Sequence, residues 1–123
     1  MQTPERTCVL VVEDEAIILL DVVDQLEEEG FTVFQAENAD VAIKMPHAHR
    51  EIRLIFADVD MPGSMDGLKL AAAVRNRWPP VKIIVTSGHR VVAISDLPDR
   101  SVFFSKTYVR KSVLSSMRGM LEV

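Results

Sequence analysis

The sequence is poor in several residue types, and each shortage excludes a class of protein. A single cysteine among 123 residues leaves no partner for an internal disulfide, so the fold is not held by cross-links. Five glycines and six prolines, without a biased stretch, exclude fibrous and low-complexity chains. No apolar run reaches the roughly 18 residues that a transmembrane helix needs. The polar start MQTPERT also lacks the pattern of a signal peptide, so we expect a cytoplasmic protein that does not bind membranes.

A basic surface is missing as well. Fourteen Lys and Arg residues face eighteen Asp and Glu residues, which gives a formal net charge of −4 with both signs interspersed. Nucleic acids and anionic lipids are bound by clustered cations. We therefore expect no direct binding of nucleic acid.

What is present is the composition of a globular protein, since 48% of the residues are hydrophobic. A chain of this length buries enough apolar surface for one domain but not for two. We expect a single domain over residues 1–123, which must deliver any output through a partner. Cys8 opens an apolar segment and is expected to be a small buried side chain.

Apolar runs of strand length alternate with helical patterns, which is typical of βαβ units around a parallel sheet. The expected strands are Cys8 to Val12, Thr32 to Gln35, Leu54 to Ala57, Lys82 to Thr86 and Val102 to Ser105. The expected helices are Glu15 to Glu29, one capped by Asn38 that ends near Pro46, Met65 to Arg77, a short one between Arg90 and Ser95, and Val109 to Leu121.

Polar side chains stand where these strands end. Glu13 and Asp14 follow the first strand, Asp58 the third, Thr86 closes the fourth and Lys106 follows the fifth. In an open parallel sheet the carboxyl ends of the strands carry the functional groups. We therefore expect an acidic cluster, a hydroxyl and an ammonium on one rim of the sheet.

Neighbouring carboxylates repel unless a cation lies between them. Mg²⁺ prefers a few carboxylates, several waters and phosphate oxygens, which fits Glu13, Asp14 and Asp58. Asp58 can then attack phosphorus and form an acyl phosphate. Mg²⁺, Lys106 and Thr86 can neutralise the charge that such a transfer develops.

Four segments together resemble the receiver domain of bacterial two-component response regulators over essentially the whole chain. They are VLVVEDE at Val9 to Glu15, DVDMPGSMDG at Asp58 to Gly67, VTSG at Val85 to Gly88 and FFSK at Phe103 to Lys106. Each segment alone is weak, but four in this order are specific. The resemblance implies a flavodoxin-like, doubly wound five-stranded parallel sheet of order 2-1-3-4-5 with about five helices.

The resemblance also implies a role for each site residue. Asp58 is the implied phosphoacceptor, Asp14 a direct Mg²⁺ ligand, Glu13 a ligand through water, and the backbone carbonyl of Asp60 a further ligand. Thr86 is implied to move toward the phosphoryl group.

Lys106 is implied to pair with the phosphoryl group, and Phe103 to change rotamer with the state of the switch. The implied partners are a sensor histidine kinase or a histidine phosphotransfer protein, an unidentified downstream protein, and a second copy of the chain. The implied protein is a signalling switch with self-catalysed phosphotransfer and autodephosphorylation rather than an enzyme with a separate substrate.

Three features depart from the usual family pattern. Thr107 replaces the proline that commonly follows the lysine, so we expect a trans Lys106-Thr107 bond and a lysine that is set less firmly. The segment MPGSMDG is one residue longer than the commonest form. Only thirteen residues, His89 to Ser101, separate the fourth strand from the fifth, which leaves little room for the fourth helix.

Two other functions compete with this interpretation. Asp58-Val59-Asp60 resembles the paired aspartates of haloacid dehalogenase-like phosphatases, but those need the pair on the first strand and an additional cap or a longer core. A phosphorylation-independent pseudo-receiver that only binds partners is the second alternative. The complete acidic cluster, Thr86 and Lys106 argue against it.

Overall fold

The computed structural model describes residues 7–61, 65–88, 92–106 and 108–122. Its centre is a parallel sheet of order β2-β1-β3-β4-β5. The strands are β1 (Cys8–Val12), β2 (Thr32–Ala36), β3 (Ile52–Asp58), β4 (Lys82–Ser87) and β5 (Ser101–Ser105). Each expected strand is confirmed, with ends that differ by two residues at most. The sequence expectation of a flavodoxin-like sheet is therefore correct.

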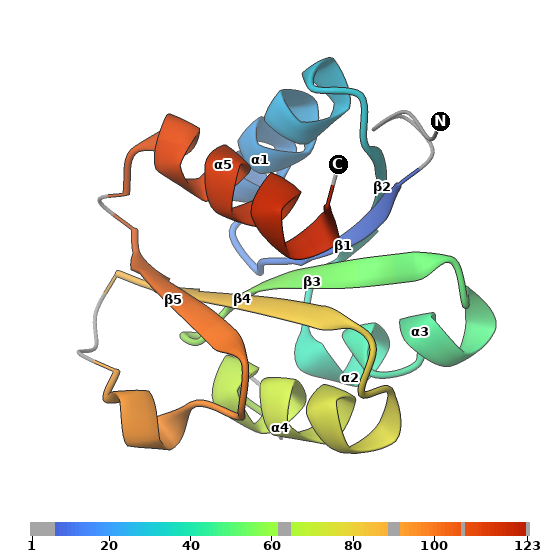
Figure 1. Cartoon of the computed structure of the whole chain (residues 1–123), viewed down its shortest axis with the longest axis vertical. Coiled ribbons are helices and arrows are strands. Elements are labelled where there is room, and N and C mark those ends of the chain that lie inside the picture. The colour runs from blue at the N-terminus through green and yellow to red at the C-terminus, as the bar shows by residue number, and fades with distance from the viewer. Residues whose placement is uncertain (1–6, 62–64, 89–91, 107, 123) are drawn as a thin grey trace.

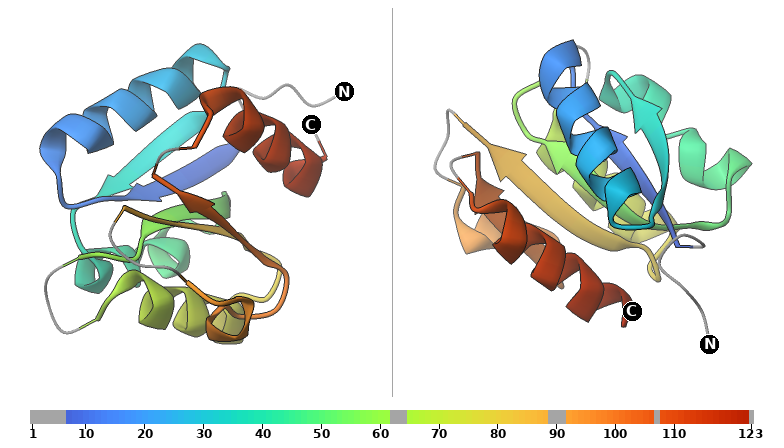
Figure 2. Two further views of the ribbon diagram at one scale, coloured as in Figure 1. Left: turned by 90° about the vertical axis from the view of Figure 1, so that its left-hand side faces the viewer. Right: turned by 90° about the horizontal axis from the view of Figure 1, so that it is seen from above.

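Helices cover both faces of the sheet, as Figures 1 and 2 show. The α-helices are α1 (Ala16–Glu28), α2 (Ala39–Ala42), α3 (Met45–Ala48), α4 (Gly67–Arg77) and α5 (Arg110–Leu121). α1 and α5 lie on one face, and α2, α3 and α4 lie on the other. Gly30 follows the last turn of α1 and has a φ of 95°. Glycine is favoured at this position because it adopts a positive φ without steric cost.

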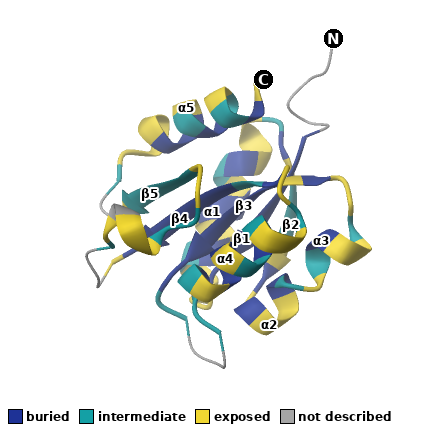
Figure 3. Ribbon diagram, turned by 60° about the horizontal axis from the view of Figure 1, so that its bottom comes forward, coloured by how far each residue is buried: buried dark blue, intermediate teal, exposed yellow. Residues whose placement is uncertain are grey.

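Alternate residues of each strand point to opposite faces, so the sheet supports two separate apolar cores. Leu10 and Val12 of β1 belong to the core beneath α2 and α4. Val9 and Val11 belong to the core beneath α1 and α5. The central strands are almost continuously apolar because both of their faces are buried (Figure 3). Cys8 is buried and free, as its sequence position predicts.

Two expected helices differ from the structure. The helix after Asn38 is two one-turn helices, α2 and α3, and Pro46 lies in the first turn of α3 rather than near a helix end. Proline suits a first turn because its missing N–H has no helical acceptor there. Asn38 does cap α2, through a 2.8 Å hydrogen bond from the Val41 amide to its side chain.

The fourth expected helix, between Arg90 and Ser95, is not an α-helix in the part that the structure describes. A single 3₁₀ turn, Ile94–Asp96, stands in its place, and residues 89–91 lie outside the described ranges. Four of the five expected helical segments therefore contain α-helix. No helix among the described residues combines the length and the apolar character that crossing a bilayer requires.

Candidate functional site

The carboxyl ends of β1, β3, β4 and β5 bring the predicted polar residues together. Asp58 is the last residue of β3 and lies in register with Thr86 of β4. Glu13 follows β1 directly, and its backbone amide bonds the Ala36 carbonyl at 3.1 Å, which fixes the chain where it leaves the sheet. Glu13, Asp58 and Thr86 are all buried. The sheet thus holds two carboxyl groups and a hydroxyl away from bulk water.

Lys106 lies between the two buried carboxylates. Its ammonium donates a hydrogen bond to Asp58 Oδ2 at 3.0 Å and lies 3.2 Å from Glu13 Oε2. The backbone amide of Lys106 also bonds the Ser87 carbonyl at 2.9 Å, which anchors the residue to β4. The expectation that this lysine is set less firmly than in most relatives stays a prediction, because these contacts do not compare it with theirs. The Lys106-Thr107 bond itself lies outside the described residues.

One lysine does not neutralise the carboxylates. Burial, and then the nearby charge of Asp58, raise the pKa of Glu13 to about 7 against the opposing effect of Lys106. Burial likewise raises the pKa of Asp58. Burial alone would lower the pKa of Lys106, but its hydrogen bonds and attraction to Asp58 and Glu13 outweigh that effect and raise it. The carboxylates carry unfavourable negative charge that a further cation would relieve.

Glu13, Asp14 and Asp58 can direct oxygen atoms toward one point. Their ligand atoms lie within 4.8 Å of one another. Asp14 is exposed whereas the other two are buried, so one side of the cluster is open to solvent. An all-oxygen donor set with an open side suits a hard divalent cation that keeps several waters, such as Mg²⁺.

The second oxygen of Asp58 is held by the loop that follows β3. The Asp60 amide donates to Asp58 Oδ1 at 3.1 Å, and the Ser87 hydroxyl donates to Asp60 Oδ2 at 2.6 Å. Ser87 is a buried residue at the end of β4. It therefore fixes the Asp60 side chain, which the sequence placed near the site without a partner.

Two glycines give this arrangement the space that it needs. A Cβ on Gly67 would overlap the backbone carbonyl of Asp58 and would lie 2.7 Å from Val59 Cα. A Cβ on Gly88 would lie 3.2 Å from Lys106 Cδ. Gly67 thus lets α4 begin directly against the end of β3, and Gly88 lets the lysine stem cross the end of β4.

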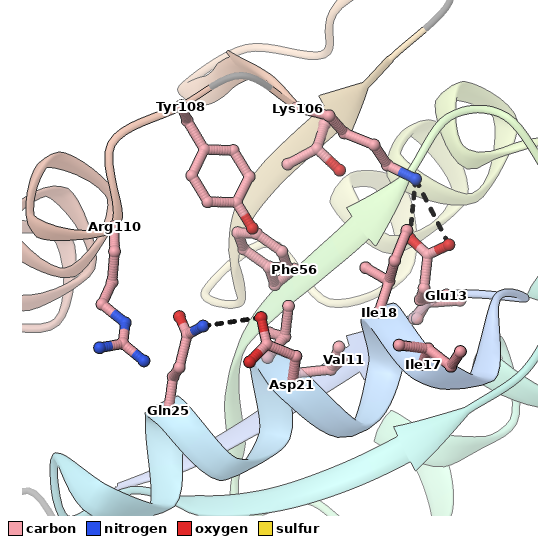
Figure 4. A pocket seen from close by; sticks show the side chains of 13 residues that line it. Val11, Glu13, Ile17, Ile18, Asp21, Gln25, Phe56, Lys106, Tyr108 and Arg110 are labelled. Carbon is pink, nitrogen blue, oxygen red and sulfur yellow. Dashed lines mark hydrogen bonds and ion pairs between the residues drawn. The ribbon is translucent and has the colours of Figure 1, made fainter.

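A groove with a cavity volume of about 520 Å³ leads from the site along α1 (Figure 4). Lys106, Glu13 and Thr86 lie at one end, and Asp21 and Gln25 of α1 line it farther along. Ile17 is 84% exposed beside the groove, and Val109, the residue before α5, is 64% exposed.

Tyr108 is a site neighbour that was not selected from the sequence. Its ring stands edge-on to Phe56 and Phe104, with centroid distances of 6.2 and 6.3 Å. Burial, followed by the charge of Asp21, raises the pKa of its phenol. An aromatic residue in a polar strand-to-helix loop was the available signal.

Of the residues singled out in the sequence, six meet at the rim: Glu13, Asp14, Asp58, Asp60, Thr86 and Lys106. Phe103 lies in β5, half-buried against the core on the α4 side. His89 lies outside the described residues. His49 precedes β3 and stacks on Phe34, with ring centroids 4.5 Å apart.

Comparison with known proteins supplies independent information. The family model described as "Response regulator receiver domain" matches residues 9–97. The sensor kinase CckA of Brucella abortus is 32% identical over 118 residues, which are 93% of this chain and 12% of that protein. The nitrogen assimilation regulatory protein NtrX of Azorhizobium caulinodans is 38% identical over 82 residues, which are 66% of this chain and 18% of that protein. The chain thus spans less than a fifth of these relatives.

Solved structures agree with the arrangement of strands and helices. A response regulator receiver protein from Sinorhizobium medicae has a TM-score of 0.89 and 26% identity, and 97% of each chain is covered. A receiver protein from Pseudomonas putida has a TM-score of 0.82 and 26% identity, covering 93% of this chain and 97% of that one.

Proposed function

Because this chain belongs to the response regulator receiver family, we propose that it accepts a phosphoryl group on Asp58 from a phosphohistidine. One observation carries the proposal: the buried Asp58 carboxylate lies 3.0 Å from the Lys106 ammonium and within 4.8 Å of the ligand atoms of Glu13 and Asp14. This arrangement places a nucleophile, a cation and a metal-binding set on one rim, which are the groups that phosphoryl transfer to a carboxylate needs.

In the proposed transfer, an oxygen of Asp58 attacks phosphorus, the phosphorus–nitrogen bond to the donor imidazole breaks, and an acyl phosphate forms. The Asp60 amide and the Lys106 ammonium each hold one oxygen of Asp58, so the carboxylate is oriented before the donor arrives. When the phosphoryl group arrives, Lys106 can exchange its carboxylate contact for a phosphoryl oxygen.

Glu13, Asp14, Asp58 and the backbone carbonyl of Asp60 would hold Mg²⁺. When bound, the ion neutralises charge on the carboxylates and on the transferred group. The raised pKa values of Glu13 and Asp58 support this assignment, because burial makes the charged forms of both carboxylates costly and a bound cation would stabilise them.

Thr86 and Phe103 are the proposed switch residues. The strand pair β3 and β4 places Thr86 beside Asp58, where its hydroxyl can bond a phosphoryl oxygen. Phe103 occupies the adjacent strand and is only half-buried, so the space that Thr86 leaves can admit a different rotamer of the ring.

The groove of Figure 4 is the proposed docking surface for the phosphodonor. It opens on Lys106 and Glu13, and exposed Ile17 lies beside it. A histidine kinase or histidine phosphotransfer protein that buries Ile17 would present its imidazole to Asp58. Ile17→Glu should slow transfer from such a protein and leave phosphorylation by acetyl phosphate unchanged.

The phosphoacceptor assignment is tested with acetyl phosphate and Mg²⁺. Intact-mass measurement should show one phosphoryl adduct on the native chain, none on Asp58→Asn, and none when EDTA replaces Mg²⁺. Asp66→Asn is the matched control, because Asp66 caps α4 at its Lys69 amide and is not a proposed acceptor. An adduct that persists in Asp58→Asn would overturn the assignment.

The same reaction separates the alternatives. A phosphatase would turn over small phosphomonoesters, and a pseudo-receiver would take up no phosphoryl group. The match to the receiver family does not favour either of these two alternatives. We propose further that one receiver domain spans residues 1–123, that it works in the cytoplasm without binding nucleic acid or membrane directly, and that it controls a downstream protein, with a second copy of the chain as one partner to test.

A further inference from the structure

A second hollow lies at the opposite end of the sheet from Asp58, where β3 and β4 begin. Its cavity volume is about 570 Å³, within the usual range for small-ligand sites. The segment before β3, the turn between α4 and β4, and the end of α5 surround it (Figure 1). Neither the acidic cluster nor the groove along α1 shares a lining residue with it.

The charge of this hollow contrasts with that of the whole chain. Arg50, Arg53, Arg77 and Lys82 line it together with one carboxylate, Glu122, in a protein of net charge −4. Arg53 reaches the Leu121 carbonyl at 3.4 Å. The other three cations form no ion pair with any residue in the described ranges. Unpaired cations around a cavity favour an anionic ligand.

The hollow continues past Lys82 into a smaller one. Lys82 also lines a cavity of about 190 Å³ with Arg75, Arg100 and Met120. Arg75 Nη2 is buried and has no hydrogen-bond partner among the described residues. Lys82 thus lines both cavities, and cations line each of them.

A flat aromatic side chain stands in the larger hollow. Trp78 is half-buried and packs against the core beneath α4. Its backbone is fixed at both sides, since its amide bonds the Val74 carbonyl at 2.8 Å and its carbonyl accepts from the Val81 amide at 2.9 Å. Arg75 also donates to the carbonyls of Pro79 and Val81, at 2.5 and 3.2 Å. The backbone that carries the indole is therefore held in place without any ligand.

We propose that this hollow binds a nucleotide, with the base packed on Trp78 and the phosphates directed toward Arg77, Lys82 and the cavity beyond. An indole held beside several cations is the combination that binds bases and phosphates together. A ligand with phosphates alone would leave the indole unused, and an uncharged ring would leave the cations unpaired. The site works independently of Asp58, so its failure leaves the phosphoacceptor assignment unaffected.

Trp78 makes the test direct, because it is the only tryptophan of the chain. ATP is titrated into the native protein in EDTA, which keeps metal out of the acidic cluster, and Trp78 fluorescence is followed. Adenosine and inorganic triphosphate are titrated in parallel. We expect saturable quenching by ATP below about 1 mM. Adenosine and inorganic triphosphate should each bind more weakly than ATP.

Variants assign the binding to this hollow. Arg77→Gln and Arg50→Gln should each weaken ATP about two- to fivefold. Lys69→Gln is the matched control, since it removes the same charge from the first turn of the same helix, α4, and should change nothing. Trp78→Phe, followed by calorimetry, should weaken ATP while leaving triphosphate binding unchanged. Thermal melts of each variant check that the fold is retained.

Three results would overturn the proposal. Triphosphate that binds as tightly as ATP would make the hollow a general anion site. Binding of poly-glutamate with no response to ATP would make it a surface for an acidic protein. No saturable binding of ATP below about 1 mM would show that the hollow is not a nucleotide site. Equal weakening of ATP binding in Lys69→Gln and Arg77→Gln would lead to the same conclusion.

Discussion

The two ends of the parallel sheet carry opposite charge in different surroundings. At the carboxyl end, Glu13 and Asp58 are buried and share one lysine. At the amino end, Arg50 and Arg77 are exposed and unpaired with any described residue. Burial makes charge expensive, whereas water screens it at the surface. At the carboxyl end the buried charges therefore cost folding free energy, which a bound cation can reduce. At the amino end the exposed charges cost little, so a bound anion would add stability without relieving such a cost.

This contrast predicts that small changes at the carboxyl end have large effects. Gly67→Ala should destabilise the protein by about 3 kcal/mol, because the new Cβ overlaps the Asp58 carbonyl and neither backbone can move freely. Phosphoryl uptake from acetyl phosphate should also be lost. Chemical denaturation and intact-mass measurement test the two effects separately.

Gly119→Ala is the matched control near the amino end. No atom lies within 4 Å of a Cβ at Gly119, which is exposed inside α5. Alanine is a better helix former, so this variant should gain about 0.5–1 kcal/mol. If both glycine variants have similar stability, the result would contradict the close contact between the start of α4 and the Asp58 carbonyl.

The buried carboxylates predict a pH dependence of stability. The pKa of Glu13 is raised from 4.5 to about 7 in the folded protein, so the folded state holds its proton more tightly than the unfolded state. This favours folding below pH 4.5, and the benefit is lost as pH rises to about 7. A pKa unit corresponds to about 1.4 kcal/mol, so the loss is up to about 3 kcal/mol. Asp58 changes stability in the same direction.

Denaturation in EDTA between pH 4.5 and 8 measures this loss. Glu13→Gln should flatten the profile, whereas Glu122→Gln, at the exposed end of α5, should not. Mg²⁺ at pH 7.5 should restore stability in the native chain more than in Glu13→Gln. A profile that is equally steep in both variants would contradict the role assigned to Glu13.

The hydrogen bond between Ser87 and Asp60 predicts a smaller effect. Ser87→Ala removes the 2.6 Å contact to Asp60 Oδ2 and should cost about 1–2 kcal/mol. We also expect a changed rate of dephosphorylation, because the released Asp60 carboxylate stands beside the acyl phosphate and can orient or repel water. Asp60→Asn should change the same rate. In the double variant the two effects should not add; full additivity would show that the residues act separately.

Much of this architecture could be predicted from the sequence, because alternating apolar runs and helical patterns are local signals. Short apolar runs bounded by turn residues favour strands with two buried faces. The ends of these strands place Glu13, Asp58, Thr86 and Lys106 on one rim. Side-chain contacts between segments far apart in the sequence were not predictable. The bond from Ser87 to Asp60 joins residues 27 positions apart.

Tyr108 shows the same limit. Its ring contact with Phe56 and the effect of Asp21 on the pKa of its phenol depend on residues that only the fold brings near it. The split of the second helix at Pro46 escaped prediction for a local reason. A proline marks a helix start as readily as an end, and the pattern around it fits both. The basic hollow was hidden because its cations are spread from Arg50 to Arg100 among acidic residues.

Gly88→Ala should have the smallest effect, and it separates function from stability at the carboxyl end. The nearest atoms to the new Cβ belong to the flexible lysine, at 3.2 Å for Lys106 Cδ and 3.5 Å for Cβ, so the stem can move by a few tenths of an ångström. Gly88 is exposed, and the stiffer unfolded chain offsets the crowding. The free energy of unfolding should therefore change by no more than about 0.5 kcal/mol.

Phosphoryl uptake by Gly88→Ala should nevertheless slow, because catalysis depends on where the Lys106 ammonium stands relative to Asp58. We expect about a two- to tenfold slower reaction with acetyl phosphate, corresponding to about 0.4–1.4 kcal/mol in the barrier. Arg50→Gln, at the other end of the sheet, should leave that rate unchanged. An unaltered rate in Gly88→Ala would mean that the lysine tolerates displacement, and that its two carboxylate contacts rather than the glycine below it fix the ammonium.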